Sequence, residues 1–260
     1  MSGGRVLGVI PARLGSERLP RKPLHRLAGR PLIEWVWRRV SAMHVLDACV
    51  VATDSEEVAE ACRTFGADVV LTAASHPSGT DRVAEVAKRA EYADVRVVVN
   101  VQGDEPFVAE SHVAAAVALV DAGWPIGTVA APLREMRAYS DSAVVKVVRR
   151  PDGAALYFSR SAIPHVRGRA PTEAELGSEH FLRHIGLYAY SPDALRRWVE
   201  LEPSALEQLE RLEQLRPLEA GMAIGVAVVD EAERGVDTPE DARAAEERLL
   251  AMGTETPTVR

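Results

Sequence analysis

Short apolar runs rich in Val and Ile alternate along the chain with stretches in which apolar residues recur at helical spacing. Such alternation predicts βαβ units and a mainly parallel sheet. The runs are apolar throughout, which is typical of strands covered on both faces. The strands predicted in this way are residues 6–11, 48–52, 69–71 and 96–101. One predicted helix begins at Pro31, and a second begins at Glu56 after a cap at Asp54 or Ser55. Two further helices are predicted over residues 81–91 and 239–252.

The middle of the chain has a different pattern, in which strand-like runs follow one another closely. This spacing predicts an antiparallel part of the sheet. Residues 164–183 combine Pro, Gly and mixed charge and predict a surface excursion or lid, whereas residues 204–218 predict one strongly amphipathic helix. The strands predicted in this part are residues 127–133, 143–148, 154–158, 187–190 and 224–229.

The length of 260 residues is enough for one sizeable α/β domain or two small ones. Because the sequence has no internal repeat and no obvious linker, we expect a single domain over residues 1–250 with a small subdomain at about 134–220. Residues 251–260 are predicted to form a flexible tail.

The charge balance and the cysteines narrow the class of protein. A formal net charge of −7 provides no overall basic field for nucleic acid. Cys49 and Cys62 form no CxxC motif, so neither a disulfide framework nor a structural zinc site is expected. The apolar run 6–11 is too short for a signal peptide or a membrane span. We therefore expect a cytoplasmic protein that binds neither nucleic acid nor membrane.

The most informative segment is the loop after the first predicted strand, which reads IPARLGSERLPRKPL from Ile10 to Leu24. It lies at the carboxyl edge of the sheet, where open α/β sheets bind ligands. Arg13, Arg18 and Lys22, with free backbone N–H groups, are suited to cradle phosphates. A generic charge run is more often a solvated basic loop. Its position directly after a buried strand favours a binding loop.

Two acidic segments are candidate metal ligands. Asp104 follows the strand 96–101 within NVQGDEP, and a carboxylate there is a suitable ligand for Mg²⁺. The segment fits an ordinary turn equally well. In GVDTPED the local sequence favours Asp237 or Thr238 as the cap of the following helix.

The segment HPSGTDR, residues 76–82, joins a predicted strand to a helix. Its small residues allow a flat ring to approach the backbone, so it is a candidate for recognition of a base. A helix cap at Ser78 or Thr80 explains it equally well.

The pattern IPARxxSxRLPxKPL resembles the signature of cytidylyltransferases for acidic sugars, in particular the 3-deoxy-manno-octulosonate cytidylyltransferase (CMP-Kdo synthetase) family. The segments HxSGT[DE]R, FLRHIGLYAY and LExxExLEQLR are also similar to segments of that family, and the resemblance spans residues 5–247. It implies an α/β protein with a Rossmann-like nucleotide-diphospho-sugar transferase fold, in which a mainly parallel central sheet is flanked by helices and carries a small antiparallel subdomain.

The resemblance also implies a function. CTP and 3-deoxy-D-manno-octulosonate (Kdo) would be converted into CMP-Kdo and diphosphate for lipopolysaccharide synthesis, by a Mg²⁺-dependent homodimer whose small subdomain binds sugar and partner subunit.

Particular residues receive roles from this resemblance. The implied CTP-binding residues are Pro11, Ala12, Arg13, Ser16, Arg18, Lys22, Ser78, Gly79, Arg82, Gln102 and Asp104. The implied sugar-binding residues are Gln102, Arg160, His184, Tyr188, Glu213 and Gln214. Asp104 and Asp237 would bind the metal. The catalytic group would be Arg13, Arg18, Lys22 and Asp104.

Some features leave alternatives open. Pro77, His165 and residues 217–221 depart from the pattern of the family. By spacing alone, Glu207, Glu210 and Glu213 favour a solvated helix face. The alternatives are a cytidylyltransferase for a sialic acid or an amino-Kdo, a sugar-1-phosphate nucleotidylyltransferase, and a CTP-binding protein without catalysis.

Overall fold

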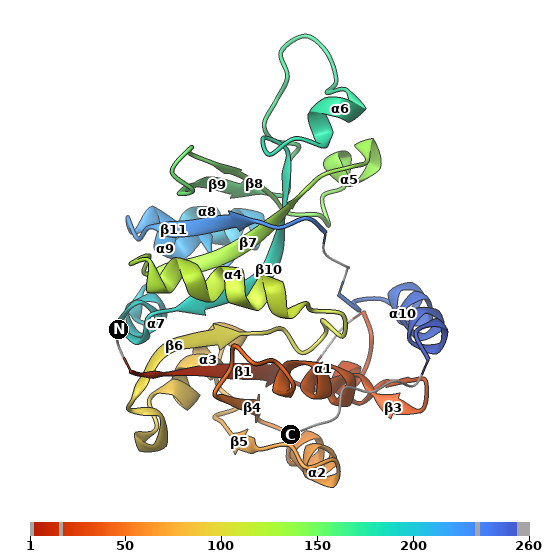
Figure 1. Cartoon of the computed structure of the whole chain (residues 1–260), viewed down its shortest axis with the longest axis vertical. Coiled ribbons are helices and arrows are strands. Elements are labelled where there is room, and N and C mark those ends of the chain that lie inside the picture. The colour runs from red at the N-terminus through yellow and green to blue at the C-terminus, as the bar shows by residue number, and fades with distance from the viewer. Residues whose placement is uncertain (1–2, 16–17, 232–234, 254–260) are drawn as a thin grey trace. The chain divides into compact units, whose positions relative to one another are not determined.

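The structure is a computed structural model that describes residues 3–15, 18–231 and 235–253 (Figure 1). The chain divides into two compact units, Met1–Glu110 with Glu233–Arg260, and Ser111–Ala232. The predicted subdomain at 134–220 falls within the second unit, and the single domain over 1–250 stays a prediction. Among the described helices, none has the length and apolar character needed to cross a membrane.

The first unit is built on a parallel sheet, as predicted. Val6, Leu7, Val9 and Ile10 are almost completely buried, which confirms that the first strand is covered on both faces. The strands pair in the order β6 (Val95–Asn100), β1 (Arg5–Ala12), β4 (Ala48–Thr53) and β5 (Val69–Leu71).

Helices join these strands, and their ends follow from local capping. Ser55 caps α2, which decides between the two predicted caps. Because Ser78 caps α3, this helix begins at Gly79 rather than at Asp81. The helices are α1 (Leu32–Ser41), α2 (Glu56–Thr64), α3 (Gly79–Ala87) and α10 (Pro239–Ala251). The short elements are η1 (Lys22–Leu24), β2 (Arg26–Leu27), β3 (Arg30–Pro31) and η2 (Ala90–Tyr92).

The second unit contains the predicted antiparallel pairing. Strand β11 runs parallel to β7, whereas the pairs β7–β10, β10–β8 and β8–β9 are antiparallel. These strands are β7 (Ile126–Pro132), β8 (Lys146–Arg149), β9 (Ala155–Ser159), β10 (Leu182–Tyr190) and β11 (Ile224–Val228).

The two longest described helices of this unit were not predicted, and neither were the short helices α5 (Met136–Ser140) and α6 (Glu173–Leu176). In α4 (Glu110–Asp121), the run AAAVALV is apolar on all sides and shows no amphipathic period. The other long helix is α7 (Pro192–Glu200), where Ser191 is the cap and Pro192 stands in the first turn. Its Trp198 is buried against the rings of Tyr188 and Tyr190, at centroid distances of 5.8 and 5.5 Å. The remaining described helices are α8 (Ala205–Glu210) and α9 (Leu215–Glu219).

The segment 164–183, predicted as an excursion or lid, is anchored within the second unit. Leu176 of α6 and Phe181 are buried in a small cluster with Leu133 and Tyr139. The Tyr139 hydroxyl donates to the carbonyl of Pro164 at 2.8 Å. The excursion therefore has its own apolar contacts, and its role as a lid stays a prediction.

The prediction of one helix over residues 204–218 is wrong. The chain breaks at Arg211, whose left-handed φ of 54° separates α8 from α9. Arg216 Nε and Nη2 donate to the two oxygens of Glu207 at 2.7 and 2.5 Å, and both side chains are mostly buried. In a continuous helix nine residues span about 13.5 Å along the axis. This ion pair therefore requires the break.

We expect Arg216→Met to lower the free energy of unfolding by about 3 kcal/mol, because it leaves the Glu207 carboxylate buried without its charge partner. Urea unfolding measures this loss. Arg169→Met removes an exposed ion pair with Glu175 and should lower the free energy of unfolding far less than Arg216→Met, because solvent screens an exposed pair. Equal losses in the two variants would contradict the role given to the buried pair.

Candidate active site

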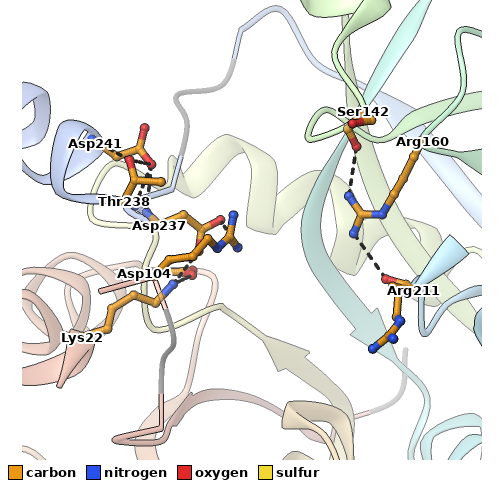
Figure 2. A network of polar contacts seen from close by, with 9 residues as sticks. Lys22, Asp104, Ser142, Arg160, Arg211, Asp237, Thr238 and Asp241 are labelled. Atoms are coloured by element: carbon orange, nitrogen blue, oxygen red, sulfur yellow. Dashed lines mark hydrogen bonds and ion pairs between the residues drawn. The ribbon is translucent and has the colours of Figure 1, made fainter. Parts of the chain in front are cut away.

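The loop after β1, the loop after β6 and the start of α10 meet at Lys22 (Figure 2). Its Nζ lies 2.5 Å from Asp104 Oδ2 and 2.7 Å from Asp237 Oδ1. Arg18 adds an ion pair to Asp237 Oδ2 at 3.2 Å. Before Lys22, Arg21 adopts a left-handed conformation, with φ of 57°, from which η1 begins. Two of the three predicted loop cations, Arg18 and Lys22, thus converge with both predicted metal ligands.

Backbone contacts explain why the two carboxylates lie together. Val236 N donates to the carbonyl of Asp104 at 2.8 Å, which joins the two acidic segments. A Cβ on Gly103 would lie 2.8 Å from the carbonyl oxygen of Pro11, so only glycine lets the β6 loop approach the end of β1 this closely.

Helix capping and the ion pair use different residues of the second acidic segment. Thr238 caps α10 and forms a capping box with Asp241. Because Thr238 supplies the cap, the carboxylate of Asp237 remains directed at Lys22 (Figure 2). The two sequence interpretations are therefore compatible here.

The charges of this cluster stabilise one another. Burial alone lowers the pKa of Lys22, but the attraction of Asp104 and hydrogen bonds to both carboxylates outweigh it and raise the pKa. For Asp237, burial raises the pKa, and the hydrogen bond and charge of Lys22, with a smaller contribution from Arg18, reverse this and lower it. Lys22 is thus charged at neutral pH and offsets the repulsion between the carboxylates.

The segment 76–82 lies beside the same strand end. Ser78 is a helix cap, and its hydroxyl also donates to Asp81 Oδ2 at 2.7 Å. A Cβ on Gly79 would lie 3.4 Å from Pro11 Cγ, which places this loop against the end of β1. The predicted base-binding segment therefore adjoins the start of the loop after β1 within the first unit.

Arg82 is almost completely buried rather than open to solvent. Its Nη2 lies 3.1 Å from Asp54 Oδ2, and its Nη1 donates to the hydroxyl of Thr72. These partners follow β4 and β5. Arg82 therefore joins the carboxyl ends of two neighbouring strands, and its contact with nucleotide stays a prediction.

Three other predicted nucleotide residues lie at or just after the end of β1, and a fourth follows β6. Pro11 and Ala12 end β1, Arg13 is exposed, and Gln102 is half-buried in the β6 loop. Ser16 lies outside the described residues.

The sugar-binding candidates other than Gln102 belong to the second unit. Arg160 Nε donates to Glu210 O at 2.7 Å. Its Nη1 donates to Ser142 O at 3.1 Å and its Nη2 to Arg211 O at 3.3 Å (Figure 2). These bonds use three of its five N–H groups and leave at most two for a ligand. Arg160 thus holds the break between α8 and α9 as well as being a candidate for a carboxylate.

His184 and Tyr188 lie side by side on β10, with ring centroids 5.4 Å apart. Burial lowers the pKa of His184 to about 3, so the imidazole is neutral at physiological pH. Burial, with smaller effects of Tyr190 and Glu213, raises the pKa of Tyr188 well above its ordinary value. Both rings are therefore neutral hydrogen-bonding groups.

Comparison with known proteins identifies the chain. The family model described as cytidylyltransferase matches residues 7–224. The 3-deoxy-manno-octulosonate cytidylyltransferase of Gemmatimonas aurantiaca is 52% identical over 237 residues, which cover 91% of each chain. The corresponding protein of Syntrophotalea carbinolica is 45% identical and covers 95% of this chain and 99% of its own. The chain belongs to the 3-deoxy-manno-octulosonate cytidylyltransferase family.

A solved structure of this family agrees with the fold. CMP:2-keto-3-deoxy-manno-octonic acid synthetase in complex with CTP superimposes with a TM-score of 0.86 at 35% identity, covering 95% of this chain and 99% of that one. The predicted α/β fold, with its mainly parallel sheet and small antiparallel part, is confirmed.

The donors present in this cytidylyltransferase suit Mg²⁺. Within the described residues, no group of three or more His, Cys, Asp or Glu side chains could enclose a metal. Mg²⁺ is commonly held by one or two carboxylates together with substrate phosphates. Asp104 and Asp237, which both contact the Lys22 ammonium, provide such a pair.

Two features of the sugar side differ from the sequence analysis. The solvated face predicted by spacing is wrong for Glu207, which is buried against Arg216, and for Glu210, which accepts from Ser159 Oγ at 2.5 Å and Arg160 N at 2.9 Å. Thr128, whose hydroxyl contacts His184, was missed. The sequence feature that could have pointed to Thr128 is a hydroxyl side chain within the otherwise apolar strand IGTVAAP.

We expect Lys22→Met to lower the free energy of unfolding by about 2 kcal/mol at pH 7, between the values for exposed and buried pairs. The lowered pKa of Asp237 means that its contribution is present above about pH 4 and is lost as the pH falls through its folded value. The raised pKa of Lys22 means that its contribution is lost only as the pH rises past about 10.

Urea unfolding of wild type and Lys22→Met between pH 3 and 9 measures the difference. The deficit should be largest from about pH 5 upward and shrink below about pH 4. Lys88→Met, at an exposed lysine, is the matched control and should show no such profile. A deficit that is constant with pH would contradict the charge pairing.

Proposed function

We propose that this chain joins the CMP moiety of CTP to Kdo and releases diphosphate. The observation that carries the proposal is the meeting of Lys22 with Asp104 and Asp237, in a chain that belongs to the 3-deoxy-manno-octulosonate cytidylyltransferase family. Cations and a carboxylate pair at one strand end are what a nucleoside triphosphate and its metal require.

In the proposed reaction, the oxygen of the anomeric hydroxyl of the sugar attacks the α-phosphorus of CTP in line. The new P–O bond forms as the bond from the α-phosphorus to the bridging oxygen breaks, diphosphate leaves with the electron pair, and the hydroxyl proton passes to solvent. Arg13, Arg18 and Lys22 would bind the triphosphate and stabilise the charge of the departing diphosphate. The protein contributes mainly position and charge.

Mg²⁺, held by Asp104, Asp237 and the phosphates, would polarise the α-phosphate and lower the pKa of the attacking hydroxyl. Before nucleotide binds, the Lys22 ammonium neutralises the same carboxylates. A bound triphosphate offers Lys22 an alternative anionic partner. Lys22 would thereby leave the carboxylates free for the metal when both substrate and metal are present.

The second unit is proposed to bind the acidic sugar. The remaining donors of Arg160 suit its carboxylate, and His184, Tyr188, Glu213 and Gln214 suit its hydroxyls. The family resemblance also supports a homodimer that supplies CMP-Kdo for lipopolysaccharide synthesis. Free Cys49 and Cys62 are consistent with the proposed cytoplasmic location.

Diphosphate release with CTP and Mg²⁺ tests the reaction, with Kdo and N-acetylneuraminate compared as acceptors. We expect release with Kdo and CTP, and none with UTP or without sugar. Diphosphate release only with another acidic sugar would assign that sugar as the substrate in place of Kdo. No release with any sugar would overturn the proposal in favour of a CTP-binding protein.

We expect Lys22→Ala to raise the activation free energy of kcat/KM by about 3–4 kcal/mol, because an electrostatic donor at the phosphates is lost. Steady-state assays at varied CTP measure this change. Lys88→Ala is the matched control, at the exposed C-cap residue of α3, and should keep wild-type activity. Near-normal turnover of Lys22→Ala would contradict its role.

Asp104→Asn should lose metal-dependent turnover, because an amide replaces a charged oxygen donor. Titration of Mg²⁺ in the same assay, with EDTA as the blank, measures the loss. Activity that survives both the substitution and EDTA would refute the metal site.

A further inference from the structure

An irregularity in strand β10 brings His184 and Tyr188 together. In the pairing of β10 with β7, Ile185 lies opposite Val129, but the next pair joins Tyr188 to Thr128. Gly186 and Leu187 are therefore extra residues, a bulge of the kind found beside functional sites. Because the bulge takes up two residues, side chains four apart in sequence occupy neighbouring positions on one face.

The Thr128 hydroxyl fills this bulge. Thr128 is completely buried, and its Oγ1 lies 2.7 Å from the carbonyl oxygen of Leu187 and 3.4 Å from that of Ile185. The same oxygen lies 2.9 Å from His184 Nε2. A hydroxyl has one hydrogen, and a carbonyl can only accept. The hydrogen therefore belongs to the short bond to Leu187, and Oγ1 accepts from Nε2–H.

The tautomer of His184 follows from this bond. A neutral imidazole carries one N–H, so protonation of Nε2 leaves Nδ1 with a lone pair. Within the part of the chain that the structure describes, Nδ1 has no hydrogen-bond partner. Phe158 packs edge-on to the imidazole at 5.0 Å and Tyr188 lies at 5.4 Å, so the ring is held on both sides.

We propose that Thr128 is a positioning residue that fixes His184 as the Nε2–H tautomer, so that Nδ1 accepts a hydrogen bond from a hydroxyl of the sugar substrate. The proposal rests on the proposed function, since it assigns His184 to the sugar. Thr128 acts through His184 and contacts no substrate itself. The sugar-binding role of His184 thereby becomes that of an acceptor with a defined atom.

Long-range ¹H–¹⁵N NMR of the nucleotide-free protein tests the tautomer directly. The non-protonated nitrogen resonates downfield, and Nε2 is recognised by strong correlations to both ring-carbon protons. The spectrum of His184→Gln assigns the signals among the seven histidines. We expect the downfield nitrogen to be Nδ1. A downfield Nε2 for His184 would overturn the proposal.

Steady-state kinetics of Thr128→Val and Thr128→Ser test the positioning role. Valine removes the acceptor from Nε2, so we expect the KM for Kdo to rise about ten-fold, the effect of one lost hydrogen bond, with the KM for CTP changed less than about two-fold. Serine keeps the hydroxyl, so Thr128→Ser should show the wild-type KM for Kdo and the wild-type downfield resonance of Nδ1.

The outcomes separate this inference from the proposed function. Wild-type protein that releases no diphosphate with Kdo contradicts the function itself. Active wild type with an unchanged KM for Kdo in Thr128→Val overturns the inference alone. Equal increases of the KM for Kdo and for CTP, or failure of Thr128→Ser to restore the KM for Kdo, also overturn it, because they indicate general loss of structure.

Discussion

The organisation of the first unit depends on the ammonium of Lys22 between the carboxylates of Asp104 and Asp237. Two carboxylates this close repel each other unless a cation lies between them. The three residues come from the start, the middle and the end of the chain, so their meeting requires the parallel sheet and the α10 cap to be in place. The same arrangement places two carboxylates around one cation, as the proposed binding of a divalent metal would require.

The part of this site that could be predicted from sequence follows a topological rule. Residues directly after buried parallel strands gather at one sheet edge, so the loop after β1 and Asp104 after β6 could be placed together without coordinates. Asp237 could not be placed there from its local sequence, which a helix cap explains fully, and it was named a candidate ligand only through the family resemblance. In the structure Thr238 supplies the cap, and the carboxylate of Asp237 contacts Lys22.

The break between α8 and α9 was beyond sequence reasoning for a different reason. Helical periodicity over residues 204–218 is satisfied by a continuous helix, and nothing local marks Arg211 for a left-handed conformation. The break depends on tertiary contacts: the Glu207–Arg216 ion pair and the bonds from Arg160 to Glu210 O and Arg211 O. Periodicity alone cannot distinguish a solvated Glu from one whose partner lies nine residues away across a break.

The candidate ligand-binding side chains of the two units differ in charge and in exposure to solvent. In the first, charged groups such as Arg13, Arg18 and Asp237 remain partly exposed, so they suit a ligand whose phosphates carry most of its free energy of binding. In the second, His184 and Tyr188 are held neutral in an aromatic cluster. Buried neutral donors and acceptors contribute little net free energy when satisfied but penalise a ligand that leaves them unpaired. Under the proposed function, discrimination between acidic sugars would belong to the second unit and would depend on which nitrogen of the His184 imidazole carries the proton.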